Sequence, residues 1–427
     1  MHLRMHGKPV GPLHGLTISL MDRFHVAGLS SACGFISWLG ATKRTEDEGT
    51  LVRALRHLGA VVHCKSNVPM SLMLGETSNN IIGTTVNPHN VALSAGGACG
   101  GEGALIALRG SMLGFGTDVA GSSRIPSAFC GSWTIKCSEN RLPQDGIATV
   151  LSGLPSAEGA VGLMANDLEI LTLVLKETLN SSFESADPEV LPLPWRQDCL
   201  DAIRRRKHTR GLSNGRLVFA MLTCDGHVRP HPPIPRAMEL VKNVLCKHGH
   251  EVIEWNPPSH LRAVENLFKI LGSTSASEAR AALEASGEPP IPQLEDWYHH
   301  QDVEPSTSAE FWALCQERQR FRTEYKSYWN GLAATTQSAR VPDGVILPVA
   351  PTLAVRPGRF QYYGYSAIVN ALDYVSGVFP VMSADRDLDG SNAEREPLSE
   401  LDRAVQSSCK FRTGMRPLTL LTHLRPT

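Results

Sequence analysis

Residues 94–131 read SAGGACGGEGALIALRGSMLGFGTDVAGSSRIPSAFCG, a dense cluster of glycine and other small residues. The stretch has no GKS or GKT sequence, so the lysine and the hydroxyl of a phosphate-binding P-loop are absent. It also lacks the GxSxG turn, because Ser122 directly follows Ala120 and Gly121. Small residues let the backbone approach a ligand closely, and the successive amides from Val119 to Ser122 predict a nest for an oxyanion. Such a nest beside a serine hydroxyl indicates acyl transfer.

Around this stretch, strand-like and helix-like segments alternate along the chain. β-branched and apolar runs of four to seven residues predict strands, and apolar residues at helical spacing predict the helices between them. We expect strand, helix and strand at 16–21, 51–58 and 61–62, and again at 216–222, 235–247 and 251–255. The alternation predicts an α/β fold in both halves of the chain.

Composition and charge narrow the classes of function. Of the 427 residues, 42% are hydrophobic and 19% are charged, against about 25% charged in typical globular proteins. A predominantly disordered chain is therefore excluded. The 41 lysines and arginines nearly balance the 42 aspartates and glutamates, which leaves no electrostatic basis for nucleic acid or an anionic membrane as the main partner. We expect a globular enzyme-like protein with a small-molecule ligand.

The cysteine and histidine patterns do not predict a metal site. The 10 cysteines stand singly without a CxxC pair, and we expect them to be buried thiols. There is no HExxH sequence, and His299 and His300 have no ligands at metal spacing, so we predict no metal and no cofactor. No apolar run approaches the roughly 20 residues of a membrane span. No secretory signal is recognised in residues 1–10, and we expect a cytoplasmic protein.

Several ordered motifs carry a resemblance to a known family. In chain order they are GPLHG at 11–15, SNVP at 66–69, TVNP at 85–88, the glycine-rich stretch, NRLP at 140–143, VRPHPP at 228–233 and LDY at 372–374. Over residues 11–382 the chain resembles the amidase signature family, and most of all its acetamidase-like branch known from fungi. The resemblance implies an α/β fold with a large mixed β-sheet flanked by helices.

The resemblance also implies a reaction and its residues. Members of the family hydrolyse amides, and occasionally esters, with a serine nucleophile, a second serine held on a cis peptide, and a lysine. Matching the GTDxxGS motif places the nucleophile at Ser122, and Asp118, Gly121 and Arg124 around it also match. Leu72 corresponds to a pocket-lining position and is expected to contact the acyl group of a small or lipophilic carboxamide.

Two positions depart from the family pattern. The bridging serine of GGSSGG is replaced by Ala98, and the lysine of an SLKD-like motif is replaced by Met21. Alanine has no side-chain acceptor and methionine offers only a weak thioether acceptor, so the proton relay as the family uses it cannot operate. Ala120 stands where glycine is usual, a change that is tolerated unless the position needs a positive φ.

These departures leave several hypotheses open. The first is a serine-dependent amidase of weak activity, and the alternative is a pseudo-amidase that binds or rearranges a small-molecule metabolite without acyl transfer. A purely structural partner protein is a third interpretation. Lys65, which precedes the SNVP motif, is a candidate substitute base, and Cys99 is a candidate replacement nucleophile or bridge.

The domain organisation follows from the same resemblance. We predict an amidase-signature domain over 1–382, with a second α/β half from about residue 211, and a polar, atypical tail over 383–427. The resemblance implies a longer N-terminal helical region and a C-terminal strand with a GxPxxxQxxG-like pattern, and neither pattern is found. We therefore expect a fold truncated at both ends, with marginal stability or a homo-oligomer that covers exposed apolar surface.

Overall fold

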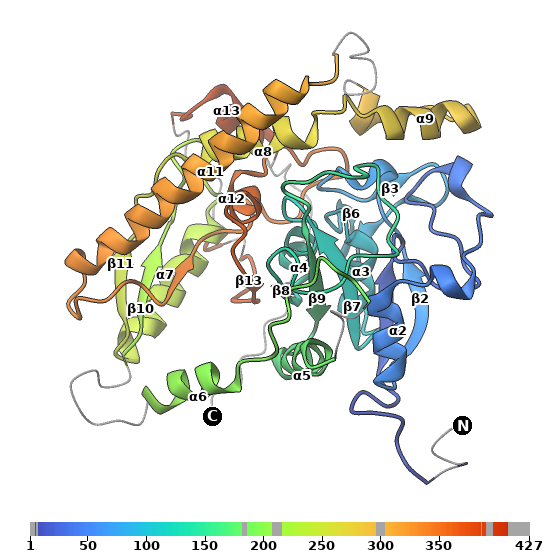
Figure 1. Ribbon diagram of the computed structural model, residues 1–427. Helices are drawn as coiled ribbons and strands as arrows, with labels where there is room; N and C mark the ends of the chain where they lie inside the picture. Colours follow the sequence, from blue (N-terminus) through green and yellow to red (C-terminus); the bar gives the residue numbers. More distant parts are fainter. Residues whose placement is uncertain are drawn as a thin grey trace.

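The computed structural model describes residues 5, 7–181, 186–206, 216–295, 304–385, 387–389 and 396–408. Its main feature is a six-stranded β-sheet with the strand order β13-β8-β9-β7-β1-β2 (Figure 1). The strands are β1 (Thr17–Met21), β2 (Val61–Ser66), β7 (Leu113–Asp118), β8 (Trp133–Lys136), β9 (Ala160–Ala165) and β13 (Ser376–Val378). β1 runs parallel to β2 and β7, whereas the other pairs are antiparallel. The expected large mixed sheet is confirmed.

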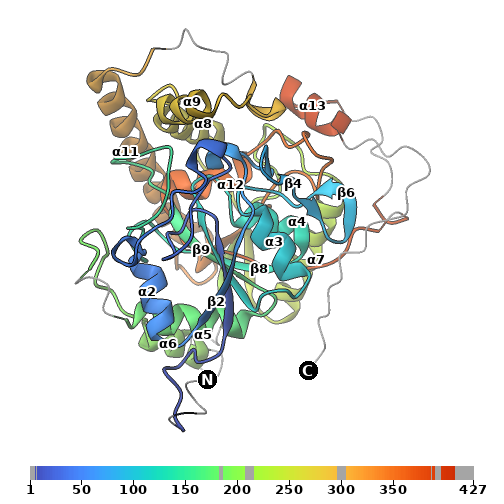
Figure 2. The ribbon, with the colours of Figure 1, turned by 90° about the vertical axis from the view of Figure 1, so that its right-hand side faces the viewer.

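Helices cover both faces of this sheet. They are α2 (Thr50–His57), α3 (Gly100–Ala107), α4 (Arg124–Cys130) and α5 (Leu168–Leu179). α3 packs against β1 and β7, α4 against β8 and β13, and α5 against β8 and β9. Figure 2 shows α3 and α4 on one side of the sheet and α2 and α5 on the other. All six residues of β7 and of β9 are buried, as central strands covered on both faces require.

The second half of the chain forms a smaller sheet of three parallel strands in the order β11-β10-β12. Its strands are β10 (Val218–Met221), β11 (Glu251–Glu254) and β12 (Gly344–Ile346), and its helices are α7 (Pro233–Lys247), α8 (His260–Leu271), α11 (Ser308–Gly331) and α12 (Gly364–Leu372). α12 packs against α8 and α11. The predicted strand–helix–strand unit at 216–255 is confirmed, because β10, α7 and β11 follow in that order.

Shorter elements connect these units. They are η1 (Ile36–Trp38), η2 (Thr45–Asp47), η3 (Met70–Leu72), β3 (Ser78–Asn79), β4 (Gly83–Thr84), β5 (Val86–Asn87), β6 (Asn90–Ser94), α6 (Gln197–Arg206), α9 (Ser277–Ser286), η4 (Pro292–Leu294), η5 (Leu332–Thr335) and α13 (Glu400–Ser408). Among the helices that the structure describes, none is both long and apolar enough to cross a membrane.

The sequence led us to expect that the cysteines are buried thiols, but two of them are exposed. Cys199 lies on α6 and Cys246 on α7, each at an exposed position, because a small side chain is tolerated on the outer face of a helix. The nine described cysteines divide into buried (Cys33, Cys99, Cys130, Cys137), intermediate (Cys64, Cys224, Cys315) and exposed (Cys199, Cys246).

Within the predicted polar tail, the structure describes the helix α13 (Glu400–Ser408), which packs against the rest of the protein. Asp402 of α13 is fully buried and accepts hydrogen bonds from the amides of Arg229 (3.1 Å) and Leu398 (2.8 Å). Val405 is buried in a cluster with Val228 and two tyrosines of the 362–365 segment. These two inward-facing side chains dock α13 against the segments around residues 228 and 362–365. Residues 409–427 lie outside the described part.

The parallel strands of the large sheet bring the predicted site together. β1 ends at Met21, β2 at Ser66 and β7 at Asp118. Carboxyl ends of neighbouring parallel strands meet at one edge of a sheet, and the loops that follow them form a crevice there. The SLMD motif and the GTDVAGSS motif therefore converge although almost 100 residues separate them.

Candidate active site

The loop between β7 and α4 is shaped by one buried carboxylate. Asp118 accepts hydrogen bonds from Gly121 N (2.8 Å), Ser123 N (3.1 Å) and Ser123 Oγ (2.9 Å). It also pairs with Arg124 through Nε (3.0 Å) and Nη2 (2.8 Å). Burial raises the pKa of Asp118, but the charge and hydrogen bonds of Arg124 outweigh it and hold that pKa well below its usual range. Asp118 is therefore an ionised anchor for the loop.

Helix α12 holds the same loop from the other side. Arg124 donates to the backbone oxygen of Ser366 (3.0 Å) and to Asn370 Oδ1 (2.5 Å), and Asn370 Nδ2 donates to Asp118 O (2.9 Å). Gly121 has a φ of 125° and a Cβ there would lie 2.5 Å from Ser366 Oγ, so only glycine fits. Ser366 and Asn370 were not anticipated, since no local pattern links α12 to a motif more than 240 residues earlier.

Ser122 lies partly exposed at the turn between β7 and α4. Of the four amides predicted to hold an oxyanion, that of Gly121 is used by Asp118. Within the described chain, the amides of Val119, Ala120 and Ser122 donate no hydrogen bond. Ala120 has no positive φ, so the alanine is accommodated. Three open amides beside a hydroxyl are an arrangement that can stabilise negative charge on a carbonyl oxygen.

The position of the bridging serine is apolar. Ala98 is buried, and the Gly97–Ala98 peptide is cis. Cys99 N donates to Ser122 O (3.0 Å), which places residues 98 and 99 directly beside the predicted nucleophile. Among the described residues, Ser122 Oγ has no hydrogen-bond partner, whereas a serine at position 98 would supply a hydroxyl there.

The position of the family lysine is filled by sulfur. Met21 is buried, and its Sδ lies 3.5 Å from Cys99 Sγ and 3.6 Å from Thr117 Oγ1. Cys99 Sγ donates to Thr117 O (3.3 Å). Burial, with a smaller contribution from the charge of Asp118, raises the pKa of the Cys99 thiol far above its usual range. Cys99 thus stays protonated, which argues against its use as a nucleophile.

Lys65 is tied into the loop that follows β1. Its ammonium lies 2.7 Å from Asp22 Oδ1 and donates to Ser30 O (2.7 Å) and Ser31 Oγ (2.8 Å). Each of its three N–H bonds therefore has a partner, and Ser122 is not among them. The geometry gives Lys65 a structural explanation, and its use as a base stays a prediction.

Leu72 ends the short helix η3 and belongs to the core of the large sheet. Its neighbour Met73 contacts that core and also the second core cluster, which contains Ala120 and borders Val119. The segment 72–73 therefore lies between the core and the nucleophile loop. This apolar environment suits the acyl group of a carboxamide.

A buried carboxyl group that sequence reasoning missed lies beneath these positions. Glu102 of α3 is fully buried and accepts hydrogen bonds from Ser19 Oγ (2.5 Å) on β1 and Ser66 Oγ (2.7 Å) on β2. Burial raises the pKa of Glu102 to about 7, although both serine hydroxyls lower it. A Cβ at Gly114 would overlap this carboxyl, which explains the glycine.

The raised pKa of Glu102 predicts a pH dependence of stability. A carboxyl whose pKa is raised by folding stabilises the protein fully below its unfolded pKa of 4.5, and this contribution is lost as the pH rises through about 7. The difference between the unfolded pKa of 4.5 and the folded pKa of about 7 corresponds to about 3 kcal/mol of unfolding free energy. Urea unfolding at pH 5 and pH 8 should therefore give a smaller loss of unfolding free energy in Glu102→Gln than in the wild type. Equal losses in both proteins would contradict the assignment.

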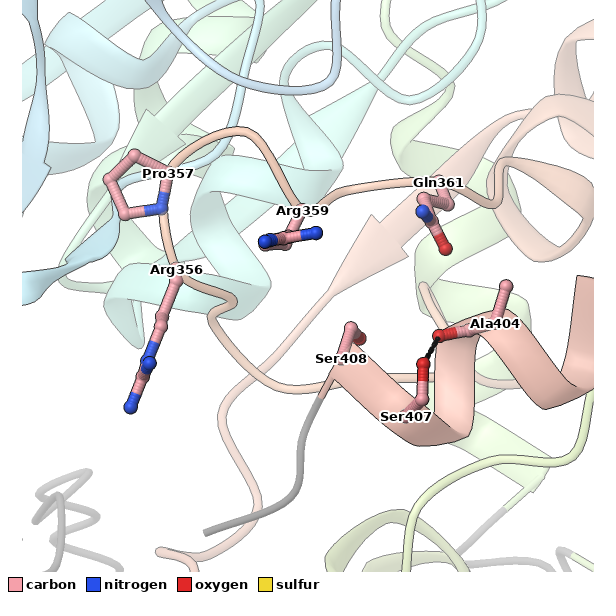
Figure 3. A pocket seen from close by; sticks show the side chains of 7 residues that line it. All are labelled: Arg356, Pro357, Arg359, Gln361, Ala404, Ser407 and Ser408. Atoms are coloured by element: carbon pink, nitrogen blue, oxygen red, sulfur yellow. Dashed lines mark hydrogen bonds between the residues drawn. The ribbon is translucent and has the colours of Figure 1, made fainter. Parts of the chain in front are cut away.

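Figure 3 shows a surface cavity, which has a volume of about 510 Å³. It is lined by the loop 356–361 and by the end of α13, with Arg356, Arg359, Gln361 and Ser407 among its residues. Ser122 does not border it. Among the described residues, no group of three or more His, Cys, Asp or Glu is placed to hold a metal ion, and His299 and His300 lie outside that part of the chain.

Comparison with known proteins identifies the family. The family model described as Amidase matches residues 2–397. The chain belongs to the amidase family and is similar in fold to its amide hydrolases. It is 40% identical over 404 residues to an acetamidase of Aspergillus oryzae (strain ATCC 42149 / RIB 40), covering 95% of this chain and 72% of the relative.

Two further comparisons agree with this assignment. An acetamidase of Emericella nidulans is 38% identical over 401 residues, covering 94% of this chain and 71% of the relative. Among solved structures, fatty acid amide hydrolase matches with a TM-score of 0.85 and 27% identity, covering 95% of this chain and 69% of that chain. The expected resemblance to the amidase signature family and its acetamidase-like branch is confirmed.

Proposed function

We propose that this protein hydrolyses a small or lipophilic carboxamide through Ser122, at a rate limited by the absence of a proton acceptor. The observation that carries the proposal is the loop 118–124, where a partly exposed serine hydroxyl stands beside three open amides. Similarity to acetamidases supports a small carboxamide as the substrate. The apolar segment 72–73 supports a lipophilic acyl group.

The reaction would proceed by acyl transfer. Ser122 Oγ attacks the amide carbon, and the amides of Val119, Ala120 and Ser122 hold the oxyanion that forms. The C–N bond then breaks, the amine leaves with the proton that Ser122 Oγ loses to solvent water, and a further water hydrolyses the ester on Ser122. With Met21 and Ala98 in place of lysine and serine, no side chain takes the hydroxyl proton, so the first step is slow.

A second candidate function is a pseudo-amidase that binds or rearranges a metabolite. The absence of a described hydrogen-bond partner for Ser122 Oγ favours it, because an activated nucleophile is hydrogen-bonded to its base. The buried Met21–Cys99 contact favours it as well, since it fills the lysine position with a stable apolar pair.

Covalent labelling separates the two candidates. Incubation with a fluorophosphonate should give a slow mass adduct on the wild-type chain and none on Ser122→Ala, because only an attacking hydroxyl forms the phosphonate ester. Intact-protein mass spectrometry over several hours provides the measurement. A wild type that is never labelled but still binds carboxamides would establish the second candidate.

Lys65→Ala serves as the matched control in the same experiment. Its labelling rate should equal that of the wild type, because the Lys65 ammonium is engaged by Asp22, Ser30 and Ser31. A rate at least tenfold lower in a variant that remains folded would instead identify Lys65 as the substitute base.

A further inference from the structure

Arg23 lies two residues beyond the end of β1 and is held by two hydrogen bonds. Its Nε donates to the backbone oxygen of Ala148 (3.0 Å), and its Nη1 donates to Thr117 Oγ1 (2.8 Å). The amide of Ala148 donates in turn to Arg23 O (2.7 Å). The side chain is therefore fixed between the end of β7 and the loop around residue 148, and it remains partly exposed.

This guanidinium has no acidic partner. No carboxylate of the described chain lies within 4.0 Å of it. Burial lowers the pKa of Arg23. Other buried cations each have a carboxylate: Lys65 with Asp22, Arg124 with Asp118, Lys136 with Asp373 and Arg318 with Glu139. A partly buried cation without a counter-ion is a position where an anionic ligand group is favoured.

Arg23 is joined to the predicted nucleophile by a short run of contacts. Thr117 Oγ1, which accepts its hydrogen bond, lies 3.6 Å from Met21 Sδ. Met21 Sδ lies 3.5 Å from Cys99 Sγ, and Cys99 N donates to Ser122 O (3.0 Å). The open cation and the Ser122 loop therefore belong to one cluster at the carboxyl edge of the sheet.

The chemistry of a guanidinium limits what Arg23 does there. It does not replace the missing base, because arginine is not deprotonated in proteins. Of its five N–H donors, two are used by Ala148 and Thr117, which leaves three for a ligand. Planar N–H pairs of this kind match the two oxygens of a carboxylate.

We propose that Arg23 binds a carboxylate group of the ligand, so that the site accepts half-amides of short dicarboxylic acids or the acids released from amides. The inference rests on the proposed function only in taking the Ser122 loop as the ligand site. Carboxylate recognition at Arg23 requires no turnover and no hydroxyl at position 122.

Isothermal titration calorimetry with the full chain tests this directly. Succinamic acid and succinamide are nearly isosteric and differ by one carboxylate, so the wild type should bind the acid about tenfold to a hundredfold more tightly. Arg23→Gln should bind both compounds equally, whereas Arg23→Lys should retain part of the preference because it keeps the charge without the planar fork.

Two further titrations complete the test. Butyric acid distinguishes a half-amide from a released acid as the source of the carboxylate, and Ser122→Ala distinguishes carboxylate binding at Arg23 from amide hydrolysis at Ser122. Butyric acid binding as tightly as succinamic acid would assign Arg23 to the released acid, and binding at least tenfold weaker would assign it to a half-amide. Ser122→Ala should keep the preference for succinamic acid even if fluorophosphonate labelling fails. Equal affinities for succinamic acid and succinamide in the wild type, or a preference that survives in Arg23→Gln, would overturn the inference.

Discussion

Replacing Met21 by lysine, Ala98 by serine and Cys99 by serine in one chain is expected to raise turnover of a simple aryl amide by about a thousandfold or more. The three changes supply a base, a bridging hydroxyl and a polar neighbour in the cluster that now holds two sulfur atoms. Groups that act as one unit are strongly non-additive, so each single variant should gain little.

The third substitution follows from the packing rather than from the motif. Met21 Sδ and Cys99 Sγ are 3.5 Å apart, and the thiol donates to Thr117 O. A lysine introduced at position 21 alone would place its amine against a protonated, buried thiol. The Met21→Lys and Ala98→Ser double variant should therefore gain less than the triple variant.

The release of chromogenic amine from p-nitroacetanilide provides the measurement, with kcat/KM compared across the single, double and triple variants. Adding Ser122→Ala to the triple variant is the control, and it should return turnover to the level of the wild type or below. A triple variant that folds, yet is no faster than the wild type, would show that loss of the proton relay does not limit the reaction.

Much of the local structure was predictable because it depends on neighbours in sequence. The strands β1, β2, β10 and β11 and the helices α2 and α7 lie where periodicity places them, within a few residues. The cluster at the carboxyl edge was predictable in part, because the family motifs assign Met21, Ala98 and Ser122 to one site, whereas the parallel pairing of β1 with β7 is visible only in the structure. The replacement of the lysine by Met21 and of the serine by Ala98 is visible in the sequence itself.

The long-range hydrogen bonds around the candidate site were not predictable from the sequence. Arg124 meets Asn370 across 246 positions, and Arg23 meets Thr117 across 94. Neither pair shares a helix face or a strand register, so no periodic pattern signals it. The burial of single residues was equally hard to predict. Asp402 of α13 is fully buried, although the segment around it has the polar composition of a protein surface.

Asp118→Asn is expected to lower the free energy of unfolding by about 3–5 kcal/mol, because it leaves the buried charge of Arg124 without its partner. The amide that replaces the carboxylate also brings an N–H group to a place where Gly121 N, Ser123 Oγ and Arg124 all donate. Urea unfolding at pH 7, followed by circular dichroism, measures the loss.

The matched control removes both charges. In the double variant Asp118→Asn with Arg124→Met, no unpaired cation remains, so the loss of unfolding free energy should be smaller than the sum of the two single losses.

The pH dependence of the unfolding free energy gives a second check. Since the pKa of Asp118 is held well below its usual range, its stabilising contribution is complete above the ordinary carboxyl pKa of about 3.9 and is lost only as the pH falls below it. The gap between wild type and Asp118→Asn should therefore be constant from pH 5 to pH 7 and narrow only in stronger acid, and a gap that already narrows near pH 6 would mean that another group holds the loop.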